Sequence, residues 1–339
     1  MRPFPGLASL RTTARNSRSE AANSPGKYFS KVRRSLPSLQ LYVAFVVLAL
    51  VAGPIDQFVS SAFLAGAAQS AALGFASCFA ALALAVTAAV CRHRAPNHSE
   101  WIALLVLALP QWFLIGAGNT SVPALHLGWG TQLLLNLEAP LWLGLLSASG
   151  AAGIEVPRAV IAAAIVGMGA VCLSLPADVT VIGWGAAPAL FVNALLGVAV
   201  VASWVYARPR LAGCPAVCAA AAYLGLSSVG YILYSVLYQQ GGLHVAESGL
   251  TWATVLPEIA TLAVGWVLWF WLLRRLSLAA FSMRMLASDA ATLLSGFFVF
   301  GLAQWRMDAA FVISCTAVIV ALRATPAGEQ PLSLGLTIS

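Results

Sequence analysis

The sequence has little charge. Of its 339 residues, only 9% are charged, whereas 60% are hydrophobic. Ordinary soluble domains carry roughly 25% charged residues because a polar surface must cover the core. The missing polar surface excludes a water-soluble globule, and the long uninterrupted apolar runs exclude the alternating strands of a β-barrel. The sequence therefore predicts an all-α polytopic membrane protein in contact with the lipid bilayer.

Recognisable catalytic and metal-binding motifs are also missing. The six cysteines form no CxxC pair, no histidine has metal-ligand spacing, and there is no Walker A, HExxH or GxSxG sequence. We therefore expect no metal, no cofactor and no enzymatic activity. The cysteines are interpreted as small core residues.

The net charge is confined to one segment. Residues 1–38 hold eight bases and one acid, which account for the whole formal charge of +7. The segment is rich in Ser and Pro, so we predict a disordered cytoplasmic tail attracted to anionic lipid, with no role in nucleic-acid binding. An organellar transit peptide is the less favoured alternative. Residues 325–339 are predicted to form a second cytoplasmic tail.

Ten apolar runs are long enough to cross a membrane, which takes about 20 residues each. With both ends inside, sixteen of the eighteen bases fall in cytoplasmic segments, as the positive-inside rule requires. We therefore predict a multi-pass cell-membrane protein with cytoplasmic termini, either a monomer or a homodimer. The runs are 39–62, 67–91, 101–118, 122–148, 157–175, 182–206, 214–238, 250–273, 277–300 and 305–324.

The chain contains an internal repeat. An offset of 151 residues places 71–150 over 222–301 with 15 identities in 80 positions. AALGFAS at 71–77 then falls on AYLGLSS at 222–228, and Glu138 falls on Asp289. Five crossings separate the copies, so the second enters the membrane from the opposite side, as in transporters with inverted repeats. The predicted halves are 39–175 and 182–324.

Several segments resemble a known family. LLLNLEAPLWLGLLSASG at 133–150 is similar to the fourth helix of the drug/metabolite transporter superfamily in its ten-helix EamA-like form. GMGAV at 167–171 resembles the end of the fifth helix, and ALLGVAVVASWVYARPR at 194–210 resembles the sixth. The chain departs from the pattern at Ala291, where the first half has Pro140. The resemblance implies two five-helix halves around a central cavity.

Four acidic residues fall inside the predicted crossings, where a charge costs roughly 2.5–3.5 kcal/mol. They are Asp56, Glu138, Glu258 and Asp289. The other seven acids, Glu100 among them, lie in tails, loops or helix ends and are expected to be solvated. Each embedded acid is a candidate for the substrate or proton pathway.

Glu138 and Asp289 occupy equivalent repeat positions, so the two-fold relation would bring them together. Mutual repulsion would make one of them a proton carrier. The alternative is a structural ion pair, because Arg284 also lies within a crossing and needs a carboxylate, which Glu258 or Glu138 could supply.

Two further features are candidates for the same pathway. Asp56 follows Gly53 and Pro54, where a helix can be locally broken, although a solvated position near the outer interface is the favoured alternative. Trp129, Gln132 and Asn136 line one helix face that suits a small amphipathic solute, or else interhelical contact.

These features favour a secondary transporter or exporter of a small organic metabolite such as an amino acid, nucleoside or drug-like solute, by alternating access and with possible proton coupling. Two alternatives from other classes stay open, namely an integral-membrane lipid-modifying enzyme and a non-transporting scaffold.

Overall fold

The fold is known from a computed structural model. It describes residues 39–56, 59, 69–119, 139–150, 154–174, 187–238, 252–300 and 305–325. Within these ranges the chain is helical and contains no strand. Four of the described helices are long and apolar enough to cross a membrane, over Ala72–Val90, Ala216–Val236, Val255–Arg275 and Arg306–Ala324. The all-α prediction is confirmed for this part of the chain, and its apolar helices are compatible with a membrane protein.

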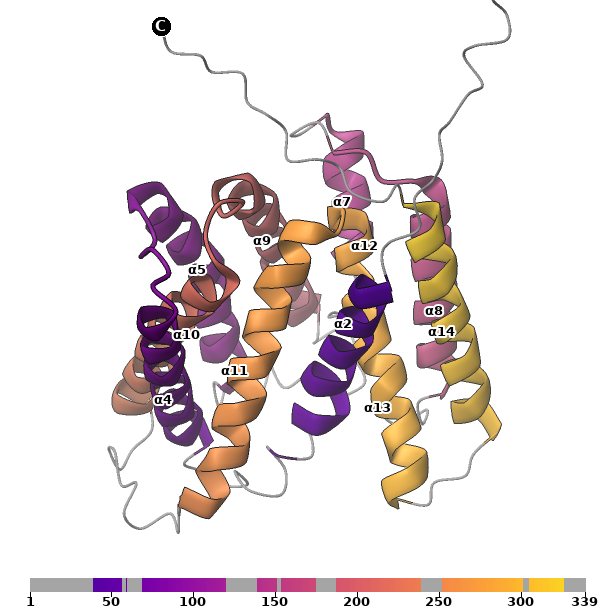
Figure 1. Ribbon diagram of the computed structural model, residues 1–339. Helices are drawn as coiled ribbons and strands as arrows, with labels where there is room; N and C mark the ends of the chain where they lie inside the picture. The colour runs from indigo at the N-terminus through magenta and orange to yellow at the C-terminus, as the bar shows by residue number, and fades with distance from the viewer. Residues whose placement is uncertain are drawn as a thin grey trace, which may run out of the picture. The chain divides into compact units, whose positions relative to one another are not determined.

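The described helices follow the predicted apolar runs (Figure 1). In the first half they are α2 (Leu39–Leu50), the π-helical turn η1 (Val51–Ile55), α4 (Gln69–Val90), α5 (His98–Asn119), α7 (Ala139–Ala148) and α8 (Arg158–Ser174). In the second half they are α9 (Ala187–Arg210), α10 (Ala216–Tyr238), α11 (Trp252–Arg275), α12 (Leu278–Ser282), α13 (Arg284–Phe300) and α14 (Trp305–Ala324).

Two runs are interrupted. In the first, the helix widens into η1 at Gly53 and Pro54, as their presence predicted. Pro54 has no N–H to donate, and the N–H of Asp56 bonds to the carbonyl of Val51, five residues back. The ninth run is split into α12 and α13. Ser277 caps α12 by accepting a 3.1 Å hydrogen bond from the N–H of Ala280.

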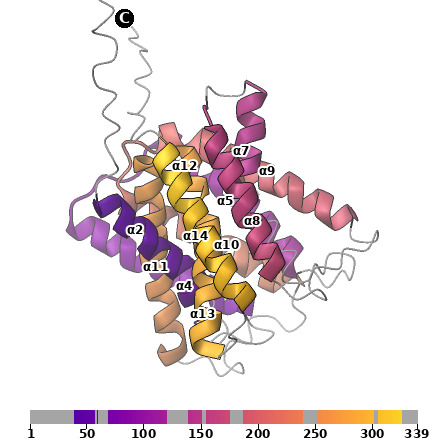
Figure 2. The same ribbon diagram turned by 90° about the vertical axis from the view of Figure 1, so that its right-hand side faces the viewer.

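Two helix pairs form the most extensive interfaces, α4 with α10 and α8 with α14. Figures 1 and 2 show α8 and α14 side by side in both views. Small residues permit the close approach of α4 and α10. A Cβ at Gly74 would lie 3.0 Å from Cγ1 of Ile232, and one at Gly225 would lie 4.0 Å from Cβ of Ala81. This is the small-residue packing typical of helices in membranes.

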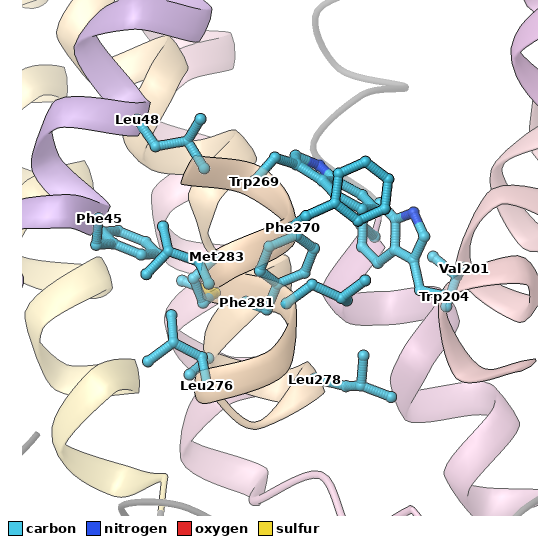
Figure 3. Close-up of a cluster of buried hydrophobic side chains, with 14 of the residues drawn as sticks. Phe45, Leu48, Val201, Trp204, Trp269, Phe270, Leu276, Leu278, Phe281 and Met283 are labelled. Carbon is cyan, nitrogen blue, oxygen red and sulfur yellow. The ribbon is translucent and has the colours of Figure 1, made fainter. Parts of the chain in front are cut away.

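Aromatic rings fill the interior where α9, α11 and α12 meet (Figure 3). Trp204 of α9 lies edge-on to Phe281 of α12, with ring centroids 5.4 Å apart. Trp269 of α11 contacts the same Phe281 ring at 5.1 Å. All three side chains are buried. Because their edges meet their neighbours' faces, the rings fix how the three helices pack.

Large apolar side chains also lie on the outside of the helices. Exposed residues of this kind include Val46, Leu82, Val86, Ile165 and Ile319. In a soluble protein such a surface would be an interaction patch, whereas in lipid it is the expected exterior.

The interpretation of the cysteines as core residues is only partly correct. Cys214 and Cys218 are buried, but Cys91 is exposed. Cys91 lies in the turn after α4, where Arg92 adopts a left-handed conformation with φ of 54°. The bond from the N–H of His93 to the carbonyl of Ala88 completes a helix-ending motif that turns this segment away from the core.

Candidate functional site

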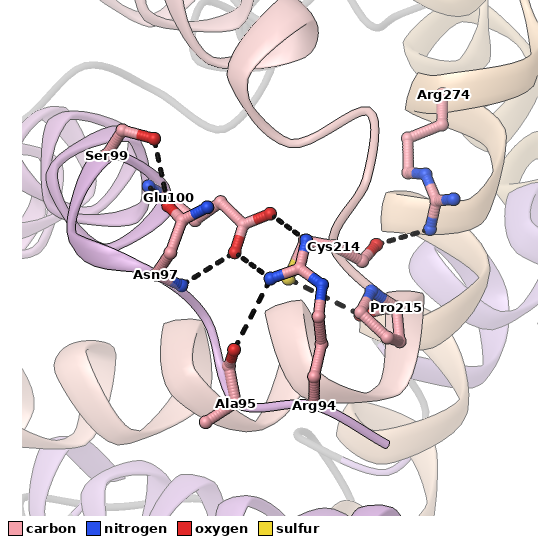
Figure 4. Close-up of polar contacts among 8 residues, drawn as sticks. All are labelled: Arg94, Ala95, Asn97, Ser99, Glu100, Cys214, Pro215 and Arg274. Carbon is pink, nitrogen blue, oxygen red and sulfur yellow. Dashed lines mark hydrogen bonds and ion pairs between the residues drawn. The ribbon is translucent and has the colours of Figure 1, made fainter.

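Polar contacts gather in two regions, and the first joins three turns at one end of the helices (Figure 4). Arg94, in the turn before α5, forms a two-pronged ion pair with Glu100, at 2.5 Å and 2.8 Å. Asn97 caps α5, because its Oδ1 accepts from the N–H of Glu100 while its own N–H donates to Oε2 of Glu100. This reciprocal arrangement is a capping box.

Two more arginines tie the neighbouring turns together by donating to backbone carbonyls. Arg208 of α9 donates to the carbonyls of Leu273 and Leu276, at 3.1 Å and 2.8 Å. Arg274 of α11 donates to the carbonyl of Cys214 in the turn between α9 and α10, at 2.5 Å. The carbonyls at the end of a helix have no partner within it, so these arginines satisfy them and hold the turns together.

The expectation that water solvates Glu100 is wrong. Its side chain is 2% exposed and is paired with Arg94. The hydrogen bond from Arg94 and, next, the one from Asn97 keep the pKa of Glu100 below its ordinary value, against the opposing effect of burial. The sequence placed Glu100 at a helix end, but it did not show that Arg94 folds back over it.

We expect Asn97→Ala to lower the free energy of unfolding by about 1 kcal/mol, the usual cost of losing an N-terminal cap.

Glu100→Gln removes the ion pair with Arg94 and should lower the melting temperature as well. Because the pKa of Glu100 is lower folded than unfolded, the pair contributes stability above pH 4.5, and this is lost as pH falls through the folded pKa. Thermal unfolding from pH 3 to 7 measures both effects.

The control is Glu155→Gln, which changes an exposed acid at the start of the segment before α8. It should leave the melting temperature nearly unchanged, because exposed charges contribute little. An equal response of the two glutamine variants at pH 7 would contradict the buried ion pair.

The second region lies where η1 packs against α11 and α13. Asp56 directly follows η1 and is half-buried. A Cβ at Gly53 would lie 2.6 Å from the carbonyl oxygen of Ser288 and 3.0 Å from Oγ1 of Thr292, so η1 touches the backbone of α13. Only glycine permits that approach.

Glu258 of α11 is fully buried, and neither of its carboxyl oxygens has a hydrogen-bond partner within the described residues. The carboxyl groups of Asp56 and Glu258 are close enough to interact electrostatically. An unpartnered buried carboxyl is costly, so its retention marks it as a functional candidate.

Arg284 and Asp289 both lie on α13, and their charges interact. The guanidinium carbon of Arg284 lies 5.2 Å from the ring centroid of Phe281, 5.3 Å from that of Trp204 and 5.6 Å from that of Trp269. These are cation–π distances. Asp289 is half-buried and lies five residues further along the helix.

Of the two carboxylates suggested for Arg284, Glu258 does not pair with it, and Glu138 lies outside the described residues. Arg94 forms an ion pair with Glu100, whereas Arg284 forms none with another described residue. Arg284 lies beside Trp269, and Glu258 precedes Trp269 by eleven residues on α11. At 1.5 Å per residue these positions are about 16 Å apart along the helix axis.

The structure therefore brings Asp56 and Glu258 together and separates them from Arg284. Four predicted site residues, Trp129, Gln132, Asn136 and Glu138, lie outside the described residues. Sequence reasoning missed the roles of Trp204, Trp269 and Phe281 around Arg284. The run WVLWFW at 266–271, with four aromatic residues in six, was the available signal.

Comparison with known proteins identifies a fold but no function. No family model matches the chain, and no curated protein matches it. A solved structure described only as "Crystal structure of protein" matches with a TM-score of 0.63 and 16% sequence identity. The match covers 84% of this chain and 94% of the other. At this identity the likeness shows a shared helical fold alone.

Proposed function

We propose that this protein is a secondary transporter of a small organic solute in the cell membrane. Its ten crossings would form two inverted five-helix halves, which rock about a site between them and open it to each side of the membrane in turn. The termini and the turns held together by Arg94, Arg208 and Arg274 would face the cytoplasm.

The packing of α4 against α10 carries this proposal. Under the repeat offset of 151, Gly74 corresponds to Gly225, and Ala81 corresponds to Ile232. Gly74 packs against Ile232, and Gly225 packs against Ala81. Exchanging the two copies of the repeat therefore turns each of these contacts into the other, as expected for copies related by a two-fold axis. The repeat is a property of the sequence and the contacts are a property of the structure, so each supports the two-fold arrangement independently of the other.

The remaining interfaces support the same exchange. Under the offset, α2 corresponds to α9, α5 to α11, α7 to α13 and α8 to α14. α5 packs on α9, and its counterpart α11 packs on α2. Likewise α7 packs on α8 and on α9, while α13 packs on α14 and on α2. A duplicated architecture of this kind is used by many secondary transporters.

Proton coupling is part of the proposal, with Glu258 as its strongest candidate. A buried carboxyl without a partner is most stable when it holds a proton, and it releases that proton when water reaches it. A rocking motion would supply that access. Asp56 faces Glu258 from η1, and Asp289 lies on α13, which also packs against η1.

Flux in proteoliposomes tests the function. We expect the purified protein to move at least one of leucine, uridine and ethidium, or an organic anion, faster than empty vesicles do. An imposed pH gradient should change the rate several-fold. Glu258→Gln should remove the gradient dependence while exchange of labelled for unlabelled solute continues, because a neutral amide mimics the protonated acid.

Glu138→Gln and Asp289→Asn are tested alongside, since these acids are related by the repeat. Arg158→Gln, at the exposed first residue of α8, is the matched control. Flux that ignores the pH gradient and is unchanged in all three acid variants would refute proton coupling. Turnover of lipid by the pure protein, without solute flux, would refute the transporter.

A further inference from the structure

The surroundings of Arg284 suggest a ligand. Arg284 is the first residue of α13, and the three rings around it come from α9, α11 and α12. The rings are buried, and Arg284 is partly buried among them. The cation therefore lies where four helices meet, beside the three aromatic side chains that Figure 3 labels as Trp204, Trp269 and Phe281.

The hydrogen-bond donors at this place lack acceptors. Nε of Arg284 and Nε1 of Trp269 are both buried, and neither has a partner within the described residues. Aromatic faces attract the positive charge of a guanidinium, but they do not satisfy its N–H groups as an oxygen would. Unpartnered donors thus lie on two neighbouring helices, and each is destabilising until it meets an acceptor.

Among the described residues, the charge of Arg284 also has no carboxylate within ion-pair distance. The carboxyl of Asp289 interacts with Arg284 but lies outside ion-pair distance, and Glu258 is about 16 Å further along α11. Arginine presents a planar set of donors that fits the two oxygens of a carboxylate, and rings beside it offer an apolar surface for a flat group.

We propose that Arg284 binds the carboxylate of an organic anion whose flat, apolar part packs against Trp204, Trp269 and Phe281. This names the substrate class for the transporter proposed above and rests on that proposal. Trp269 would add its indole N–H to the donors of Arg284. Anions with an aromatic ring should bind better than small aliphatic ones, because a flat ring can pack against the aromatic side chains when the two halves move apart.

Calorimetric titration of the detergent-purified full chain tests this. The probes are phenylacetate, its neutral amide phenylacetamide, the cation phenethylamine, and acetate. We expect phenylacetate to bind and to quench tryptophan fluorescence. Phenylacetamide should bind about tenfold to a hundredfold more weakly, which is the effect of losing a charged hydrogen bond. Phenethylamine and acetate should be weaker still.

Arg284→Gln should weaken phenylacetate binding by the same factor while leaving the affinity for phenylacetamide unchanged. Arg284→Lys keeps the charge but loses the planar donors, so its affinity should be intermediate. Trp269→Phe keeps a ring and loses the N–H, so it should weaken binding several-fold. Arg158→Gln is the control and should bind as the original chain does. Elution and melting profiles show whether each variant is folded.

Three results would overturn the proposal: no phenylacetate binding by the folded chain at millimolar concentration, equal affinity for the amide or amine, or unchanged affinity in folded Arg284→Gln. Should Arg284→Gln fail to fold, the affinities of Arg284→Lys and Trp269→Phe for phenylacetate test the proposal instead. Proteoliposome flux separates the two proposals. Anion binding without flux of any solute would contradict the proposed transport function but not the anion site at Arg284. Flux of ethidium or uridine without anion binding would contradict the anion site but not the transport function.

Discussion

Replacing Gly53 by alanine is expected to destabilise the protein by about 1–3 kcal/mol, the usual cost of overpacking. The new methyl group would lie 2.6 Å from the carbonyl oxygen of Ser288, which is backbone and has little room to move. That oxygen also accepts a 3.0 Å hydrogen bond from Oγ1 of Thr292, so shifting it would disturb α13 as well. Gly53→Leu should prevent η1 from packing on α13 at all.

The matched control is Gly169→Ala in α8. A methyl group there would meet nothing within 4 Å. Alanine is a better helix former than glycine, so this variant should gain up to about 1 kcal/mol. Thermal unfolding in detergent compares the two. Equal melting temperatures for Gly53→Ala and Gly169→Ala would contradict the close contact between η1 and α13.

Replacing Glu258 by leucine should have the opposite effect on stability and a large effect on function. A buried polar group without a partner costs roughly 1–3 kcal/mol, and an apolar side chain of similar size removes that cost. The variant should therefore melt at a higher temperature than the original protein. It should also lose the response of flux to a pH gradient, because leucine carries no proton.

Glu100 provides the comparison for this result, because the two glutamates are both buried and differ in their partners. Glu100 holds Arg94 and Asn97, whereas the carboxyl of Glu258 has no hydrogen bond within the described residues. Glu100→Gln should therefore lower the melting temperature of the protein, whereas Glu258→Leu should raise it. If Glu258→Leu lowers the melting temperature as Glu100→Gln does, then Glu258 is held by a partner.

The positions of the helices were predictable because each apolar run is long and strongly hydrophobic. The interruption at Gly53 and Pro54 was predictable for a local reason, since proline cannot continue the helical hydrogen bonds. The described helices lie within or overlap the ten predicted runs, with bounds that shift by several residues. The division into two inverted halves stays a proposal, supported by the exchanged glycine contacts.

The site was less predictable, because it depends on which helix faces meet. Charge within a predicted crossing singled out Asp56, Glu258, Arg284 and Asp289 as candidates, and their role in transport stays a prediction. Sequence separation gave no indication that Trp204 and Arg284 are neighbours, because their positions are 80 residues apart. The charge of Arg284 within a predicted crossing also suggested a carboxylate partner, whereas the rings of Trp269 and Phe281 lie beside its guanidinium. Several of the described helices, such as α4, α5 and α8, are apolar on all sides, so their sequences do not identify the inward face.

The π-helical turn at Val51–Ile55 has a geometric consequence for Asp56. A π-turn contains one residue more than an α-helical turn, so it acts as a one-residue insertion in the helix. Moving that extra residue along the chain would shift the register by one position, which rotates each side chain it passes by about 100° around the axis. No net loss of helical hydrogen bonds is required. A shift of the π-turn past Asp56 would therefore turn its carboxyl away from Glu258 while the first helix stays folded.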